Sequence, residues 1–185
     1  MRYPAGHKEA VRAAIVQQAA LLLRREGLAG VSVPALMRAA GLTHGGFYAH
    51  FPSREAAVAA AVEAAAGQTN AGAFAPEAGG LAQLLETYLS MGHVQHPEGG
   101  CVLAALGSEG ARQAEPVRGA FARAARGMLR RVEARLHPEA APGSLSDEGL
   151  RLAAQMVGAV VLARLVDDDE LAEQLLSAAR RAPSA

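Results

Sequence analysis

Two short helix-forming stretches meet at Gly41-Leu42, and this tight junction constrains the fold more than any other feature of the chain. Ser32 precedes the first stretch, where its hydroxyl can accept a hydrogen bond from an unpaired N–H of the first helical turn. Thr43 holds the same position before the second stretch. The pattern predicts helices over about 33–40 and 44–51, joined as in a helix-turn-helix.

The rest of the chain also favours helices. Hydrophobic residues, mostly Ala, Leu and Val, make up 51% of the 185 residues, and only 4% are aromatic, which disfavours a β-sandwich. Glycine and proline clusters divide the chain into segments, so we expect an all-α fold of about nine helices. The other expected helices span 7–26, 54–66, 81–94, 101–109, 115–136, 144–166 and 169–181, with a loop over 67–80.

These segments suggest two domains. A three-helix domain is expected over 1–55 and a larger helical domain over 56–185, with the helix at 54–66 as connector. Residues 1–55 carry seven basic and three acidic residues although the whole chain has no net charge, which favours a polyanionic partner for the first domain.

The sequence also indicates a compartment. It contains no membrane-spanning run and no export signal, so no membrane partner is expected. Cys101, the single cysteine, excludes an internal disulfide and fits a reducing cytoplasm.

Small and polar residues open the second helix of the predicted motif. In a helix-turn-helix this end enters the DNA major groove first. Thr43 and His44 can offer polar groups to the bases, whereas Gly45 and Gly46 lack side chains and would let the backbone approach the groove closely. Two glycines in one turn cost roughly 1 kcal/mol each relative to alanine.

Aromatic and basic residues complete the motif. Phe47 and Phe51 are four residues apart and share a face that can dock on the neighbouring helices. Tyr48 and His50 then point elsewhere and are suited to donate to phosphate oxygens. Arg54 stands at the start of the next helix, where the helix dipole disfavours a cation unless an anion such as phosphate is near.

Residues 8–65 resemble the DNA-binding domain of the tetracycline-repressor (TetR) family. The matching residues are Ile15, Ala19, Leu22, Gly27, Ser32, Val33, Ala39-Ala40-Gly41-Leu42-Thr43, Gly45, Phe47-Tyr48, His50-Phe51, Ser53 and Glu55. Two positions depart from the family pattern: Arg54 replaces the usual Lys, and His44 stands where many members have Lys or Arg.

The resemblance implies a homodimeric repressor that binds a near-palindromic DNA operator. In this family the last two long helices of each subunit form a four-helix interface, and a small molecule in the larger domain releases the DNA. The expected helices over 144–166 and 169–181 fit that interface, because Met156, Val157, Val160, Val161 and Leu165 give the first of them a broad apolar face.

Three interpretations of Cys101 remain open. It can be a buried apolar residue with His93 and His96 on the surface, a reactive thiol whose thiolate is stabilised by the helix start and a nearby imidazolium, or a metal ligand beside the two histidines. The run from Gly100 to Glu109 resembles a subgroup with a Gly-Cys pair here, some members of which sense electrophiles or oxidants. We rank the metal site last and expect no cofactor.

An ordinary organic effector is also compatible with the sequence. Candidate residues of its pocket are Tyr88, Met91, Met128, Gln155 and Met156.

The alternative classes are an enzyme and an all-α protein-interaction adaptor. No catalytic set with a recognised spacing is visible, and the acidic run at 167–170 reads as helix capping. An adaptor would explain the interface helices but not the basic front of the chain.

Overall fold

The computed structural model describes residues 7–75 and 79–181 and is entirely helical over those ranges. The first domain contains α1 (His7–Gly30), α2 (Val33–Ala39) and the 3-10 helix η1 (His44–Ala49), followed by α3 (Arg54–Ala71). The remaining elements are α4 (Leu81–Tyr88), α5 (Met91–Gln95), the 3-10 helix η3 (Pro97–Gly99), α6 (Val102–Gly110), α7 (Val117–Leu136), α8 (Asp147–Leu165) and α9 (Asp169–Arg180). The all-α fold with nine α-helices in the described ranges is therefore confirmed.

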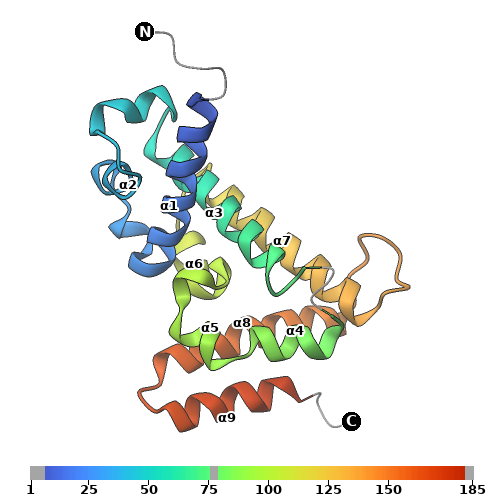
Figure 1. Cartoon of the computed structure of the whole chain (residues 1–185). Coiled ribbons are helices and arrows are strands. Elements are labelled where there is room, and N and C mark those ends of the chain that lie inside the picture. The colour runs from blue at the N-terminus through green and yellow to red at the C-terminus, as the bar shows by residue number, and fades with distance from the viewer. Residues whose placement is uncertain (1–6, 76–78, 182–185) are drawn as a thin grey trace.

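The helices form two regions that meet around α6 (Figure 1). α1, α2 and η1 lie at one end of the molecule, while α4, α5, α8 and α9 lie at the other. α3 and α7 run side by side between them and pack extensively on each other.

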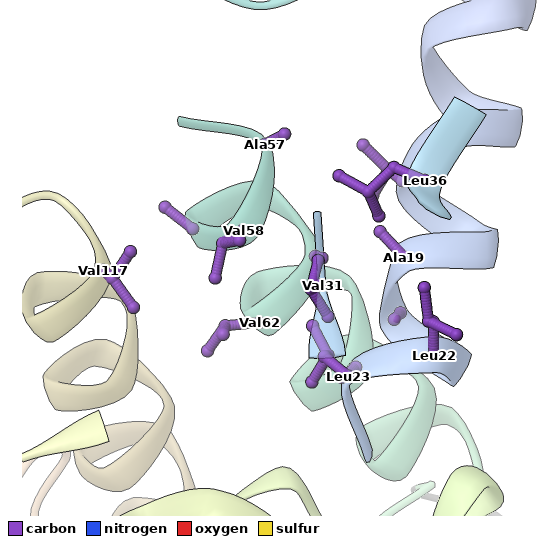
Figure 2. Packing of buried hydrophobic residues seen from close by; sticks show 14 of the residues in the cluster. Ala19, Leu22, Leu23, Val31, Leu36, Ala57, Val58, Val62 and Val117 are labelled. Carbon is purple, nitrogen blue, oxygen red and sulfur yellow. The ribbon is translucent and has the colours of Figure 1, made fainter. Parts of the chain in front are cut away.

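The core of the first domain continues into the second. Buried residues of α1 and α3 pack together, as Figure 2 shows for Ala19, Leu23, Val58 and Val62. Val117 of α7 belongs to the same cluster, as do Val102 and Leu106 of α6. A second cluster fills the space between α4, α7, α8 and α9. Because close-packed side chains transmit displacements, the first domain is mechanically joined to α6 and α7.

Several expected helix boundaries differ in the structure. The connector helix expected to stop at residue 66 continues to Ala71, because Thr69 Oγ1 donates to the Ala65 carbonyl and Gln68 bonds to α1. The expected loop at 67–80 is correspondingly shorter, and residues 76–78 lie outside the described ranges. The expected helix at 81–94 is divided, since Ser90 accepts from His93 N and starts α5.

The start of α8 also differs from the expected helix at 144–166. α8 begins at Asp147, because Ser146 is its N-cap: the Ser146 hydroxyl accepts from Gly149 N at 3.0 Å. The buried Glu133 carboxylate of α7 accepts from the backbone N–H and the hydroxyl of Ser146, and the backbone bond is the main reason why the pKa of Glu133 is lowered. A cap that depends on a residue 13 positions away is not visible in the local pattern.

Candidate nucleic-acid interface and the Cys101 pocket

The turn between α2 and η1 has the predicted geometry. Ser32 caps α2 by accepting from Ala35 N at 3.3 Å. Gly41 has a φ of 70°, a left-handed conformation that glycine adopts without strain, and Leu42 N then donates to Met37 O at 2.8 Å. The two helical segments are thereby held in a helix-turn-helix arrangement (Figure 1).

The second segment presents small and polar groups. It is a 3-10 helix, and within the described structure Thr43 makes no side-chain capping bond, so the expected Thr43 cap is wrong. The exposed Thr43 hydroxyl is therefore not committed to the backbone. A Cβ on Gly45 would meet open space, whereas one on Gly46 would touch Met37 Cε at 3.6 Å. His44 lies at the start of η1, but its side chain is outside the described structure.

As expected, Phe47 and Phe51 are buried in the core of the first domain, whereas Tyr48 is exposed. Phe47 and Phe51 are 0% and 2% exposed and stack with ring centroids 5.6 Å apart. The Arg12 guanidinium lies 4.8 Å from the Phe51 ring centroid. Tyr48 is 68% exposed. The half-buried His50 has a buried Nδ1 without a partner in the described structure, so a phosphate contact would depend on its Nε2.

Arg54 does not point toward a free anion site, which corrects the expectation from the helix dipole. Its Nε donates to Val31 O and its Nη2 to Leu28 O, both at 2.5 Å. These carbonyls belong to the segment after Gly27, where a φ of 78° interrupts α1. These carbonyl oxygens, with the Glu55 carboxylate 3.7 Å from Nη1, are the negative partners of the cation, and Arg54 thus links the α1–α2 connection to α3.

Cys101 is buried and lines a cavity. The residue is 4% exposed and immediately precedes α6. A cavity of about 360 Å³ beside it is lined by Gln68, Thr69, Gly72, Ala73, Thr87, Tyr88, Ser90, Gly92, His93, His96, Gly99, Gly100 and Cys101. The structure therefore brings together three of the expected effector residues: Tyr88, His93 and Cys101.

His93 is held as a neutral ring by two backbone partners. Its Nδ1 lies 2.6 Å from Tyr88 O, and its Nε2 accepts from Cys101 N at 2.9 Å. Since a carbonyl only accepts, the proton belongs on Nδ1. Burial is the largest cause that lowers the pKa of His93 to about 4. His93 is therefore not the imidazolium that the reactive-thiol interpretation invoked at neutral pH, and a ring with both nitrogens engaged is poorly placed to bind a metal.

The Tyr88 hydroxyl is the unpaired polar group of this pocket. The side chain is buried, and its oxygen has no hydrogen-bond partner among the described residues. Burial raises the pKa of Tyr88 well above its usual value, and the neighbouring Cys101 raises it further. The two groups are thus close enough to interact electrostatically, although their geometry does not make a regular hydrogen bond.

The other expected effector residues do not line this cavity. Met128 meets Cys101 only in a separate small hollow of about 20 Å³, and it also lines a groove of about 570 Å³ between α6, α7 and α8. Gln155 lines a cavity of about 250 Å³ beside α4 and α9. Met91 and the fully buried Met156 belong to the second core. One continuous pocket containing all these candidates is therefore not what the structure shows.

Two arginines beside the pocket were not anticipated. Arg24 is 3% exposed although its side chain is charged, and Arg164 is half-buried in α8. Burial lowers the pKa of both, partly offset by Cys101 and Glu98. The available signal for Arg24 was its position four residues after the buried Ala20.

The expected interface helices are partly internal. Met156 and Val160 are fully buried within the subunit, and Val157 and Val161 pack partly against its second core. The large apolar side chains left exposed on these two helices are Leu150 (39% exposed), Leu162 (52%) and Leu165 (75%) of α8 and Leu171 (43%) of α9.

No helix in the described ranges is both long and apolar enough to span a membrane.

Comparisons with known proteins agree with this architecture. Residues 15–61 match the bacterial regulatory proteins of the tetR family, and residues 79–179 match the tetracyclin repressor-like C-terminal domain. A search of curated proteins gives no significant match.

Solved structures show the same fold. The reduced form of NemR from E. coli is 20% identical with a TM-score of 0.70, covering 92% of this chain and 93% of NemR. A TetR-family transcriptional regulator from Cytophaga hutchinsonii is 20% identical with a TM-score of 0.76, covering 96% and 95%. The multidrug binding protein EbrR, complexed with malachite green, is 22% identical with a TM-score of 0.57, covering 91% and 96%.

The two family matches together span both regions of the fold, and the second alone covers more than half of the chain. The protein belongs to the TetR family and is a DNA-binding transcriptional regulator, not an enzyme.

Proposed function

We propose that this regulator is a cytoplasmic repressor that binds a near-palindromic operator as a homodimer and releases it when a small molecule or electrophile occupies the Cys101 pocket. The proposal keeps the two domains predicted from the sequence, 1–55 for DNA and 56–185 for effector and dimer contacts, with α3 as connector. The observation that carries the proposal is the cavity beside Cys101, whose wall includes residues of α3.

DNA contact is assigned to the surface formed by Ser32, Thr43, His44, Gly45, Gly46, Tyr48 and His50. Tyr48 is the most exposed large apolar side chain after Leu165, although its ring meets that of Phe47 edge-on with the centroids 5.3 Å apart. Its hydroxyl is suited to a phosphate, and the free Thr43 hydroxyl to a base edge. Two such surfaces related by a two-fold axis would read half-sites about 34 Å apart, or a multiple of that.

The pocket favours uncharged or anionic ligands. Arg24 donates to Gly100 O and Arg164 to His93 O, so both cations bond directly to carbonyl oxygens of the pocket wall, while the Glu98 carboxylate is near enough to raise the pKa of both. The unpaired Tyr88 hydroxyl can donate to an acceptor oxygen once the pocket opens toward it. A cationic dye such as malachite green, seen in EbrR, is therefore a poor match for this pocket.

The test begins with selection of a DNA duplex from a randomised pool by the wild-type protein. Iodoacetamide is then added, and fluorescence anisotropy follows DNA release from wild type and Cys101→Ser. Release from wild type but not from Cys101→Ser supports the proposal. Labelling of Cys101, verified by mass spectrometry, without loss of DNA affinity would overturn the Cys101 part of it. Failure to select any sequence would overturn the operator part.

A further inference from the structure

We propose that Arg24 couples the Cys101 pocket directly to the DNA-binding domain, so that a displaced pocket wall releases the C-terminal part of α1. This inference rests on the proposed effector role of the pocket and adds the residue that transmits its state. It concerns a polar connection from α1 to the pocket, in addition to the packing of α3.

Both hydrogen bonds of Arg24 end on the pocket wall. Nη1 donates to Gly100 O at 3.0 Å, and Nη2 donates to the side-chain oxygen of Gln68. Gly100 and Gln68 both line the cavity. Arg24 itself belongs to α1 of the DNA-binding domain. A group that pushes the wall outward therefore moves the acceptors of a residue in the DNA-binding domain.

A second set of hydrogen bonds joins α1 to the pocket wall through α3. The Gln68 side-chain amide also donates to Gln17 of α1, and Thr69 Oγ1 lies within hydrogen-bond distance of Gly100 O. α1, α3 and the segment before Cys101 thus share one hydrogen-bond network. Coupled networks of this kind respond as a unit when one acceptor moves.

The pocket wall is tightly packed at Gly100. A Cβ on Gly100 would lie 2.5 Å from His93 Cδ2 and 3.2 Å from Arg164 Nη2. Arg164 donates from Nη2 to His93 O at 2.6 Å, which anchors this segment to α8. Because His93 and Arg164 occupy the space on their side, displacement of Gly100-Cys101 is passed to the two partners of Gly100 O, Arg24 of α1 and Thr69 of α3.

Arg24 is buried at an energetic cost, so packing alone does not account for an arginine at this position. Burial lowers the pKa of Arg24, so the site opposes its charge, and its Nε has no hydrogen-bond partner among the described residues. A methionine of similar length would fill the space without that desolvation cost. The arginine therefore favours one relative position of α1 and the pocket, in which both of its acceptors are present.

The decisive experiment is a double-mutant cycle between Cys101→Met, whose longer side chain pushes into the pocket, and Arg24→Met. The readouts are hydrogen exchange of the peptide covering residues 20–30 and the Kd for the selected duplex. In the wild-type background, Cys101→Met should speed exchange and weaken DNA binding by about tenfold, within the usual range of coupling between sites. In the Arg24→Met background, exchange should already be fast, and Cys101→Met should change neither readout by more than about twofold.

Arg25→Met provides the matched control. Arg25 is the exposed neighbour of Arg24 and pairs with Glu26. The full effect of Cys101→Met should persist in this background. Equal effects of Cys101→Met in the wild-type and Arg24→Met backgrounds would overturn the proposal. If Arg24→Met does not fold, Gln68→Met replaces it; it removes one acceptor of Arg24 and should reduce the coupling, whereas unchanged coupling would count against the network.

An iodoacetamide arm separates this inference from the proposed function. If labelling of Cys101 releases DNA equally from wild type and Arg24→Met, the effector role stands and the Arg24 connection is overturned. If labelling leaves DNA binding unchanged while the mutant cycle is non-additive, electrophile sensing fails and the Arg24 connection stands.

Discussion

The Glu109 carboxylate of α6 accepts a hydrogen bond from the backbone N–H of Leu28 at 2.9 Å. Leu28 follows Gly27, whose positive φ interrupts α1, and the Leu28 carbonyl accepts from Arg54 of α3. One peptide segment of the DNA-binding domain is thus held from both sides by the connector helix and by α6. The Leu28–Glu109 hydrogen bond is thus a second link between the two domains, at the opposite end of α6 from Cys101.

We therefore expect Glu109→Ala to loosen the DNA-binding domain. The substitution leaves the buried Leu28 N–H without its acceptor, which should cost about 1–3 kcal/mol of unfolding free energy and lower the Tm by several degrees. Thermal denaturation followed by circular dichroism measures the change. Glu109→Gln keeps an acceptor oxygen and serves as the control. A Glu109→Ala Tm equal to that of wild type would show that water replaces the bond without cost.

Arg54→Met tests whether this arginine is structural or binds phosphate. The structural assignment predicts a loss of about 2 kcal/mol of stability, because Leu28 O and Val31 O lose a charged donor. It also predicts that the slope of log Kd for DNA against log salt stays constant. A phosphate contact would instead reduce that slope by about one for each arginine removed. Salt titrations of DNA affinity, combined with the Tm, separate the two roles.

Much of the first domain could be predicted from its sequence because its determinants are local. The Ser32 cap, the Gly41 turn and the Phe47–Phe51 pair each depend on residues within a few positions of one another, and each is found in the structure. The resemblance of residues 8–65 to the TetR family then predicted the DNA-binding function.

The determinants that escaped prediction join distant parts of the chain. Arg54 reaches carbonyls more than 20 residues away, and Arg24 bonds to Gly100 O across 76 positions. One of the three interpretations of Cys101 placed an imidazolium beside the thiol, but the burial of His93 and its two backbone partners arise only when α4 and α5 fold against the start of α6. Composition and spacing carry no signal for such contacts.

His93 should make the protein less stable as the pH falls. Its pKa is lowered from 6.5 to about 4, so the unfolded chain takes up a proton before the folded one does. The stabilising contribution is complete above about pH 6.5 and is lost progressively toward pH 4, by about 3 kcal/mol at most. We expect the Tm of wild type to fall over this range more steeply than that of His93→Gln. Glu133, whose pKa is also lowered, is common to both proteins.

His96→Gln is the matched control for the pH experiment, because His96 is exposed and lies only three residues away. The steep loss of Tm toward low pH should remain in this variant, since the contact of His96 with Glu98 joins two solvent-exposed side chains. A His93→Gln profile as steep as that of wild type would show that other groups cause the loss.

The DNA surface can be tested with two substitutions that should differ in kind. Tyr48→Phe removes an exposed hydroxyl assigned to phosphate and should weaken binding to all duplexes alike, by roughly tenfold for the dimer. Thr43→Ala removes a hydroxyl assigned to a base edge and should change the preference at one position of each half-site. Binding to the selected duplex and to single-base variants gives both numbers. A uniform loss with Thr43→Ala would reassign Thr43 to the backbone.

Dimerisation through α8 and α9 predicts that Leu165→Asp produces a monomer. Leu165 is the most exposed of the large apolar side chains, at 75%, and a two-fold interface carries each substitution twice. Loss of two buried leucines, each worth about 1.5–3 kcal/mol, should weaken the dimer by at least about 100-fold. Size-exclusion chromatography with light scattering over a concentration series measures the change. Leu145→Asp, at a leucine that is 43% exposed outside α8 and α9, should remain as dimeric as wild type. If Leu165→Asp remains equally dimeric, the interface lies elsewhere.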